Sequence, residues 1–496
     1  MTTIRGSAGA NVQQLVNLRS QLDDLQRQLS TGKKSTTYAG LGLGRGVSVS
    51  LRAQVSAMGA FDETIGTVET RISVAQLSLS RMFDLGNNLK TTMAQGNSGG
   101  GTLGATTVQQ TANISLDEMI GLLNSQAGDR YLFSGRDTDK PAVESYDHLL
   151  NGDGTRAGLK QIISERSQAD LGANGLGRLT VSSPSAGTVA LTEDTTTFGM
   201  KMASVTSTLS NATVTGPAGA PPELSVDFTG GNPSPGEAIT VRFTLPDGST
   251  QSMTLTATTA NPPGDGSFTI GVNANDTASK FQAAMTGALG TLAATQLTAA
   301  SAVQASNEFF DADVNNPPLR VDGPPFDSST GLVAGTSANS VIWYTGEVGT
   351  DSARSSATAR IDSSLTVNYG MRANEDGIRS VLQGMATMAA VTVPDDANTS
   401  GLSSALNQRV ATSLNGSGGG QTIAKIQTDL AAAQVSLDSA KTRHLQQSST
   451  LSGFLDQIQG VSTEEVGVEL LALQTRLQAS MQVTAMLYQT SLVNYL

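Results

Sequence analysis

The sequence predicts an α+β protein: a long α-helical, coiled-coil-like stem built from both termini, with β-rich outer domains inserted in the middle. The first observation is the placement of proline, because all fifteen prolines of the 496 residues lie between Pro141 and Pro394. Proline breaks helix interiors, so long helices are expected only in the two proline-free ends. The second observation is that apolar residues recur in both ends at spacings of three and four, the period of one helix face.

The N-terminal helical stem is expected to span residues 1–130 and to begin with a leucine seam. The leucines follow a three-four-three-four spacing, the pattern by which one helix packs along another. They are Leu15, Leu18, Leu22, Leu25 and Leu29. Thr31 and Gly32 are then expected to end this helix, because glycine is common just after a helix C-terminus.

Two more helices are expected in this stem. A glycine-rich connection at 38–46 leads to a helix at 47–95, and the glycine-rich run at 96–104 separates it from a helix at 107–127. Such narrow apolar stripes bury against other helices rather than around a compact core. In the longer helix the residues expected to pack in this way are Ile65, Val68, Ile72 and Leu79. In the shorter one they are Val108, Ile114, Ile120 and Leu123.

The proline-containing middle predicts β structure. Residues 131–204 are expected to form a β-hairpin and connecting region, with a β-type run at 130–134 and a hairpin turn signal, NGDG, at 151–154. Residues 306–370 are expected to form a β-rich return to the stem. Alternating apolar and polar residues place its short strands at 341–344, 358–361 and 364–369.

Residues 205–305 predict an inserted β-rich α/β module, which is rich in threonine and serine and poor in charge. A tight turn, PDG at 246–248, is expected between its second and third strands, and a short amphipathic helix at 277–289. The four strands are expected at 224–228, 238–245, 252–257 and 267–272.

The C-terminal helical stem is expected over residues 371–496, with a helix at 371–388, a glycine linker at 416–420 and helix from 423 onward. An apolar stripe near the end comprises Val466, Leu470, Leu473, Leu477, Met481, Thr484 and Leu487. The chain then ends on the apolar sequence SLVNYL, which includes Leu492. Chain ends are usually polar, so we expect something outside this chain to cover the final helix.

Composition excludes several classes of protein. The net charge of −12 argues against nucleic acid or an anionic membrane as the main partner. No apolar run is long enough for membrane insertion, and the first residues lack the apolar core of a secretory signal peptide. The absence of cysteine excludes disulfides, thiolate metal sites and cysteine nucleophiles.

No constellation of residues predicts catalysis, a cofactor or a metal. The two histidines, His148 and His444, are far apart and lack companion ligands. The glycines at 40–46 have the wrong spacing for a dinucleotide loop, and the acidic run at 311–322 lacks the glycine and glutamate of a calcium loop. Glu464 and Glu465 fit the start of a helix better than a carboxylate pair. We therefore expect that the protein is not an enzyme.

Several motifs resemble the flagellin and hook-associated protein family of bacterial flagella. They are LSTGK at 29–33, RYLFSG at 130–135 with Thr138 and Pro141 after it, LALQTRLQA at 471–479 and the terminal SLVNYL. The RYLFSG element, with IISERSQADLG at 162–172 and WYTGE at 343–347, is most similar to the hook–filament junction proteins, the third hook-associated protein. The resemblance covers roughly residues 1–180 and 340–496. The glycine-rich 36–46 loop and the 205–305 module depart from the family pattern.

This resemblance implies a structural role outside the cell. Members pair their terminal helices and assemble into a ring or tube, contacting the hook and adjacent hook-associated or flagellin subunits. They are exported through the flagellar type III apparatus without a cleaved signal peptide, which also suggests an export chaperone for the C-terminal helix. The expected assembly residues are those named above in the first two helices, together with Leu470, Leu473, Leu477, Met481, Leu487 and Leu492. The last helix is expected to pair with the leucine seam at 15–29 and with the apolar stripe of the second helix at 58–82.

Three other interpretations remain open at this point. The chain could be a filament-forming flagellin, which would polymerise in thousands of copies. It could be a secreted adhesin or carbohydrate-binding protein that uses the threonine-rich module. The apolar stripes could also form an ordinary intramolecular coiled coil with no assembly.

Overall fold

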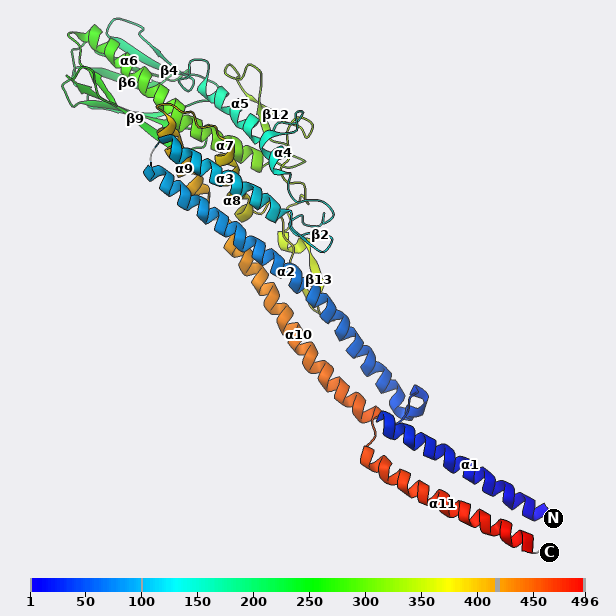
Figure 1. Ribbon diagram of the computed structural model, residues 1–496. Helices are drawn as coiled ribbons and strands as arrows, with labels where there is room; N and C mark the ends of the chain where they lie inside the picture. The colour runs from blue at the N-terminus through cyan, green and yellow to red at the C-terminus, as the bar shows by residue number, and fades with distance from the viewer. Residues whose placement is uncertain (1, 100, 415–419, 494–496) are drawn as a thin grey trace. The chain divides into compact units, whose positions relative to one another are not determined.

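Two units divide the chain in the computed structural model, which describes residues 2–99, 101–414 and 420–493 (Figure 1). The first, here called the terminal unit, comprises residues 1–69, 359–367 and 434–496. The second, here called the central unit, comprises residues 70–358 and 368–433. Two helices, α2 (Arg45–Gly99) and α10 (Ile423–Gln459), are each divided between the two units. Helical and β regions are separate in the chain, which confirms the α+β fold class.

The terminal unit is built from helices of both chain ends. Helix α1 (Thr2–Thr31) lies beside α11 (Thr463–Val493), and the first part of α2 lies beside the second part of α10 (Figure 1). A short 3₁₀ helix, η1 (Tyr38–Gly44), precedes α2, and most of the hairpin formed by β13 (Thr358–Arg360) and β14 (Thr366–Asn368) belongs to the same unit.

The ends of these helices follow their sequence signals. Gly32 has a φ of 66° and its N–H donates to the carbonyl of Gln28 at 2.8 Å, so the predicted glycine end of the first helix is confirmed. At the start of α11, the N–H of Glu465 donates to Oγ of Ser462 at 3.2 Å. Glu464 and Glu465 occupy the first turn, as the favourable interaction of acidic residues with a helix N-terminus predicts.

In the central unit, α3 (Gly101–Leu123) packs against α8 (Asp376–Ala390) and α9 (Thr399–Leu414). The prediction that α3 begins at 107 is wrong, because glycines 101 and 104 are helical. A Cβ on Gly104 would lie 2.7 Å from the carbonyl oxygen of Gly96, so the glycines permit close helix approach. Ile114 is 70% exposed, whereas the expected neighbours Val108, Ile120 and Leu123 are buried.

The predicted linker at 416–420 lies almost wholly outside the described residues. Helix α8 begins at Asp376, five residues later than expected, and extends to Ala390. Among the residues that the structure describes, no helix combines the length and the hydropathy that crossing a membrane requires.

Short elements connect the helices of the central unit. The β-type run expected at 130–134 forms β2 (Arg130–Tyr131), paired with β1 (Gln126–Ala127). The expected hairpin turn at 151–154 instead joins α4 (Tyr146–Asn151) to α5 (Leu159–Leu171), because the flanking residues are helical. A third two-stranded ladder joins β11 (Leu319–Val321) and β12 (Leu332–Ala334).

In place of the strand expected at 341–344, the described structure has one isolated bridge, between Val143 and Tyr344. The apolar residues of this segment are nevertheless buried. Trp343 donates from Nε1 to the carbonyl of Phe310 at 3.0 Å, at the end of α7 (Thr298–Phe310). The strands expected at 358–361 and 364–369 are confirmed as β13 and β14.

Two four-stranded sheets form the β-rich part of the central unit. One has the order β3–β4–β7–β6 and the other β10–β9–β8–β5, and each is antiparallel except for the parallel pair β9–β10. The bounds are β3 (Leu179–Ser182), β4 (Thr188–Glu193), β5 (Lys201–Ser207), β6 (Thr213–Ala218), β7 (Glu223–Asp227), β8 (Ala238–Thr244), β9 (Thr250–Thr258) and β10 (Ser267–Thr269). All four strands predicted after residue 205 are confirmed.

Helix α6 (Ala274–Leu292), which confirms the predicted amphipathic helix, shares one hydrophobic core with both sheets. Phe228, Phe268 and Phe281 meet in that core at ring-centroid distances of 5.1–6.3 Å. Strands β3 and β4 lie before residue 205, where the sequence places the start of the module, and their side chains enter the same core. The predicted PDG turn joins β8 to β9, with the N–H of Gly248 donating to the carbonyl of Leu245 at 2.9 Å.

Candidate assembly surface

The two terminal helices, α1 and α11, cover each other along one narrow face. Leu15, Leu18, Leu22 and Leu25 of α1 are partly buried, as are Leu470 and Leu477 of α11. Among the described side chains of α11, only Val466 and Leu473 are fully buried, at 4% and 6% exposed. The pair therefore buries one seam and leaves the remaining helix faces open.

The expected C-terminal stripe is only partly on this seam. Met481 is 48% exposed, and so is Leu29 of α1 at 42%. Met481 lies eight residues after Leu473, which places it roughly 80° around the helix from Leu473. Ser480 and Thr484 are partly buried instead and continue the seam. The side chains of Leu487 and Leu492 lie outside the described residues.

The pairing partner of the last helix also differs from expectation. The sequence suggested that α11 pairs with both the leucine seam and the second helix, but α2 pairs with α10. Ile65 and Val68 are buried in the terminal unit, and Ile72 and Leu79 are buried in the central unit. These four side chains are 0–2% exposed, so they stabilise the subunit itself and are not available to a neighbour.

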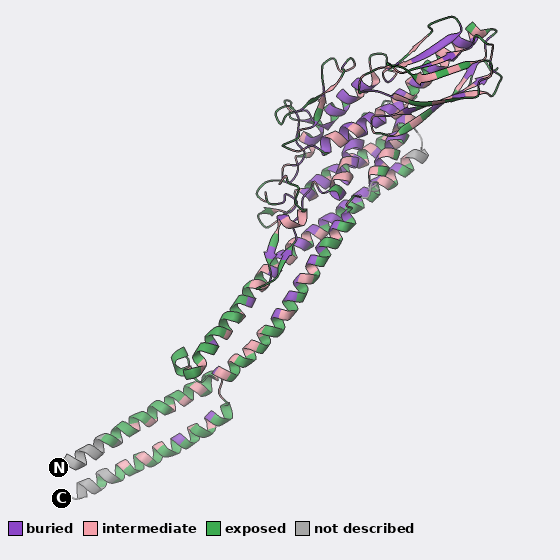
Figure 2. Ribbon diagram, turned by 180° about the vertical axis from the view of Figure 1, so that it is seen from behind, coloured by how far each residue is buried: buried purple, intermediate pink, exposed green. Residues whose placement is uncertain are grey.

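The terminal unit exposes many large apolar side chains. The view coloured by burial shows the helices near the N and C labels as mostly exposed (Figure 2). Twelve of their valine, leucine, methionine and phenylalanine residues are 46–68% exposed: Val12, Val16, Val47, Val49, Val435, Leu445, Phe454, Val468, Leu471, Met481, Val483 and Met486. Scattered exposed apolar residues are normal, but this set is repeated along several helices, which makes these helices a candidate contact surface.

Polar contacts fix α2 against α10 in the terminal unit. The side chain of Gln459 is buried, accepts from Arg52 at 2.6 Å and donates to Oγ of Ser48. Lys441 forms an ion pair with Glu69 at 3.0 Å, and this contact raises the pKa of Lys441. These contacts join positions more than 370 residues apart, so local sequence spacing could not predict them.

His444 lies at the centre of a charged cluster. Its side chain is 1% exposed, Nδ1 is 2.7 Å from Oδ1 of Asp62, and Nε2 is 3.8 Å from Oδ2 of Asp362. Arg443 binds the same Asp362 carboxylate at 2.7 Å, and this bond, with the N–H of Ser363, lowers the pKa of Asp362. The cluster ties the β13–β14 hairpin to α2 and α10. The sequence indicated only an isolated histidine, because both carboxylates are distant in the chain.

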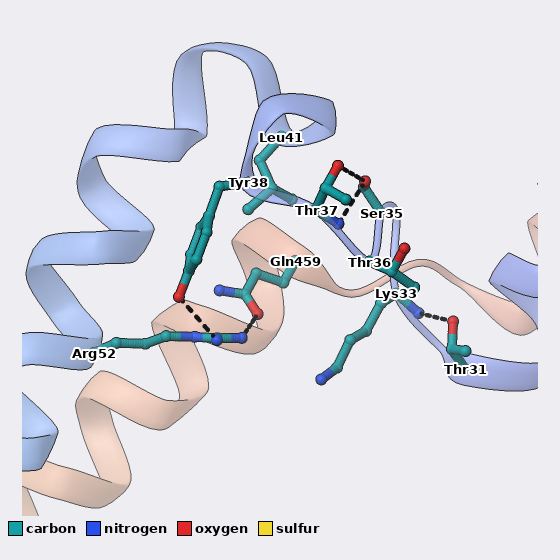
Figure 3. A pocket seen from close by; sticks show the side chains of 9 residues that line it. All are labelled: Thr31, Lys33, Ser35, Thr36, Thr37, Tyr38, Leu41, Arg52 and Gln459. Carbon is teal, nitrogen blue, oxygen red and sulfur yellow. Dashed lines mark hydrogen bonds between the residues drawn. The ribbon is translucent and has the colours of Figure 1, made fainter.

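A polar cavity of about 430 Å³, here called the loop pocket, lies where α1, η1, α2 and α10 meet (Figure 3). Arg52 spans one side and donates to the hydroxyl of Tyr38 at 3.1 Å. Ser35 accepts from the N–H of Thr37 at 3.1 Å and shapes the loop. The lining residues are Thr31, Lys33, Ser35, Thr36, Thr37, Tyr38, Leu41, Arg52 and Gln459. The sequence of this stretch predicts only a connection between helices, and its one signal of a site is the pair of lysines at 33 and 34.

Comparison with known protein families gives a match over the N-terminal part of the chain. Residues 5–138 match the family model of the bacterial flagellin N-terminal helical region. This part of the chain is therefore similar to the N-terminal helical region of bacterial flagellins. It contains nearly all of α1, all of α2 and α3, and the RYLFSG element, and therefore the nine expected assembly residues from Leu15 to Leu79. No curated protein matches the chain.

Proposed function

We propose that this chain is a structural subunit of the bacterial flagellum that joins hook to filament as an axial junction protein. The observation that carries the proposal is the exposed apolar surface of the terminal unit in a chain whose residues 5–138 match the flagellin N-terminal helical region. A flagellin-like subunit needs such a surface because its terminal helices pack against other subunits.

The apolar helix faces of the terminal unit are incompletely covered by the chain itself. The α1–α11 pair buries only one seam, while side chains such as Val16, Leu471 and Met486 remain 57–65% exposed. Placing these faces against different faces of a neighbour creates a heterologous contact, which continues from subunit to subunit into a ring or tube. Burial of apolar surface would supply the driving force at roughly 25 cal/mol per Å².

The junction role rests on sequence resemblance at RYLFSG and WYTGE. Both motifs lie in the central unit, where Phe133, Trp343 and Tyr344 are at most 2% exposed. The N–H of Glu347 donates to the carbonyl of Ser134 at 2.9 Å, so the two motifs form one structural element. The alternative within the same family is a filament-forming flagellin, which would use the same terminal surface.

This role implies location in the extracellular flagellum, at the hook–filament junction or in the filament. It also implies export without a cleaved signal peptide and capture of the C-terminal helix by an export chaperone. The neighbours would be the hook and the adjacent hook-associated or flagellin subunits. No enzymatic step, cofactor or metal enters this function.

Removal of residues 484–496 tests the role of the terminal helix. The truncated protein should keep a folded central unit, seen by circular dichroism and thermal unfolding, but should fail to enter flagella and should abolish motility. Val272→Ser is the matched control, because Val272 is an 89% exposed apolar residue of the central unit and its loss should leave motility intact. Normal swimming with the truncated protein would contradict the proposal.

Electron microscopy of the purified full chain distinguishes the two flagellar roles. A junction protein should form a short ring at the ends of isolated hooks and should not extend further. Long filaments growing from the purified protein alone would assign the filament role instead.

A further inference from the structure

The segment that forms the loop pocket is positively charged in an acidic chain. Residues 25–61 contain Arg27, Lys33, Lys34, Arg45 and Arg52 and no aspartate or glutamate, whereas the whole chain carries a net charge of −12. Of these five cations, Arg27 pairs with Asp24 at 2.7 Å. The positive charge of the loop is therefore largely uncompensated by its own sequence.

Lys33 and Arg52 place two cations in the pocket lining without a carboxylate beside them (Figure 3). Among the described residues, the guanidinium of Arg52 bonds only neutral acceptors, Gln459 and Tyr38, and it lies 5.4 Å from the Tyr38 ring centroid. Within the part of the chain that the structure describes, Nζ of Lys33 has no hydrogen-bond or ion-pair partner. The other described lining groups are hydroxyls, an amide and Leu41. This donor-rich set suits a carboxylate, because charge-assisted hydrogen bonds to carboxylates are the strong ones.

The beginning of α11 offers the complementary chemistry. Glu465 and Glu469 are one helical turn apart, both are exposed, and their carboxylates form no ion pair among the described residues. Val468 lies on the same face and is 68% exposed. The loop exposes apolar groups as well, since Tyr38 is 41% exposed and Leu43 is fully exposed. An acidic and apolar helix face thus matches a basic and apolar loop.

We propose that the loop pocket binds the acidic face of α11, Glu465 and Glu469, from a second copy of this chain. The contact rests on the proposed assembly function and specifies one of its interfaces. Pocket and helix face are different patches of the molecule, so the contact is heterologous and repeats from subunit to subunit around a ring or tube. The adjoining face of α11, with Val466 and Leu473, stays buried in the subunit.

Lys33→Glu tests the pocket in the full chain, because Lys33 contributes its charge without supporting other side chains. The critical concentration for assembly in the presence of isolated hooks, measured by sedimentation and confirmed by electron microscopy, should rise about fivefold. Added salt should reduce the difference in critical concentration between this variant and the wild type, since exposed charges are screened. The matched control is Lys34→Glu, which makes the same charge change on an exposed neighbour outside the pocket lining and should have little effect.

Charge exchange identifies the occupant. Glu465→Lys with Glu469→Lys, added to Lys33→Glu, should restore the wild-type critical concentration. The control exchange adds Asp23→Lys and Glu63→Lys to the same Lys33→Glu variant. It gives the same net charge through other exposed positions and should not restore the wild-type critical concentration. Equal effects of Lys33→Glu and Lys34→Glu, or equal rescue by both exchanges, would overturn the pocket contact while leaving assembly itself intact. A wild-type chain that stays monomeric even with isolated hooks would instead contradict the proposed function.

Discussion

The terminal unit and the β-rich part of the central unit use apolar residues in opposite ways. In the β-rich part, Phe228, Phe268 and Phe281 are fully buried in a core that both sheets and α6 close. In the terminal unit, Phe454 and Leu471 are 48% and 64% exposed, although they lie on long regular helices. A sheet-and-helix core can enclose itself, whereas a pair of helices covers one face only. The comparison indicates that one region encloses its own core, whereas the other leaves apolar helix faces uncovered.

The largest effect on stability is expected in the enclosed core. Phe281→Ala removes a ring that contacts both other phenylalanines at 5.1 and 5.3 Å, and should destabilise the β-rich part by about 3–5 kcal/mol. Urea unfolding, followed by hydrogen exchange in β7 to β9, measures the loss. Leu471→Ser is the contrasting variant, because an exposed position should change monomer stability by less than about 0.5 kcal/mol. A comparable loss in both variants would remove the distinction between the two regions.

A smaller effect is expected where the terminal unit does bury polar groups. His444→Leu deprives the Asp62 and Asp362 carboxylates of their shared partner, and should destabilise the α2–α10 contact by about 1–2 kcal/mol. Hydrogen exchange of the amides around 437–447 should become faster. His148→Leu is the control, because the His148 side chain is 45% exposed, and the same amides should be unaffected. Unchanged exchange in His444→Leu would mean that the cluster contributes nothing to this contact.

The smallest effect is a pH dependence in the β-rich part. The N–H groups of Ser210 and Ser234, with the hydroxyl of Ser210, hold the Glu237 carboxylate and lower its pKa. A lowered folded-state pKa contributes stability above the unfolded-state pKa near 4.5, and that contribution is lost as the pH falls through the folded-state pKa. Glu237→Gln should therefore flatten the decline of thermal stability below about pH 4.5. An identical acid profile for the variant and the wild type would show that this carboxylate is not a source of the decline.

Much of the fold could be predicted because its signals are local. The position of Gly32, the strands from 224 to 269 and the first turn of α11 all depend on neighbours within a few residues. The predictions that failed required knowledge of what lies opposite in space. Ile114 has a helical spacing suited to burial but faces solvent, and the NGDG turn joins two helices because its flanks are not strands. The loop pocket was missed because its cations become a site only when Gln459 and Arg52 meet.

The sequence by itself determined where the helices and strands lie and which stripes are apolar, since helix and strand periods are properties of consecutive residues. Tertiary structure decided which stripes are covered. It paired α11 with α1, buried Ile72 and Leu79 inside the subunit, and placed His444 between two carboxylates. It also left Met481 exposed. Each of these outcomes depends on partners hundreds of residues away or on helix rotation accumulated over several turns, which a local pattern does not specify.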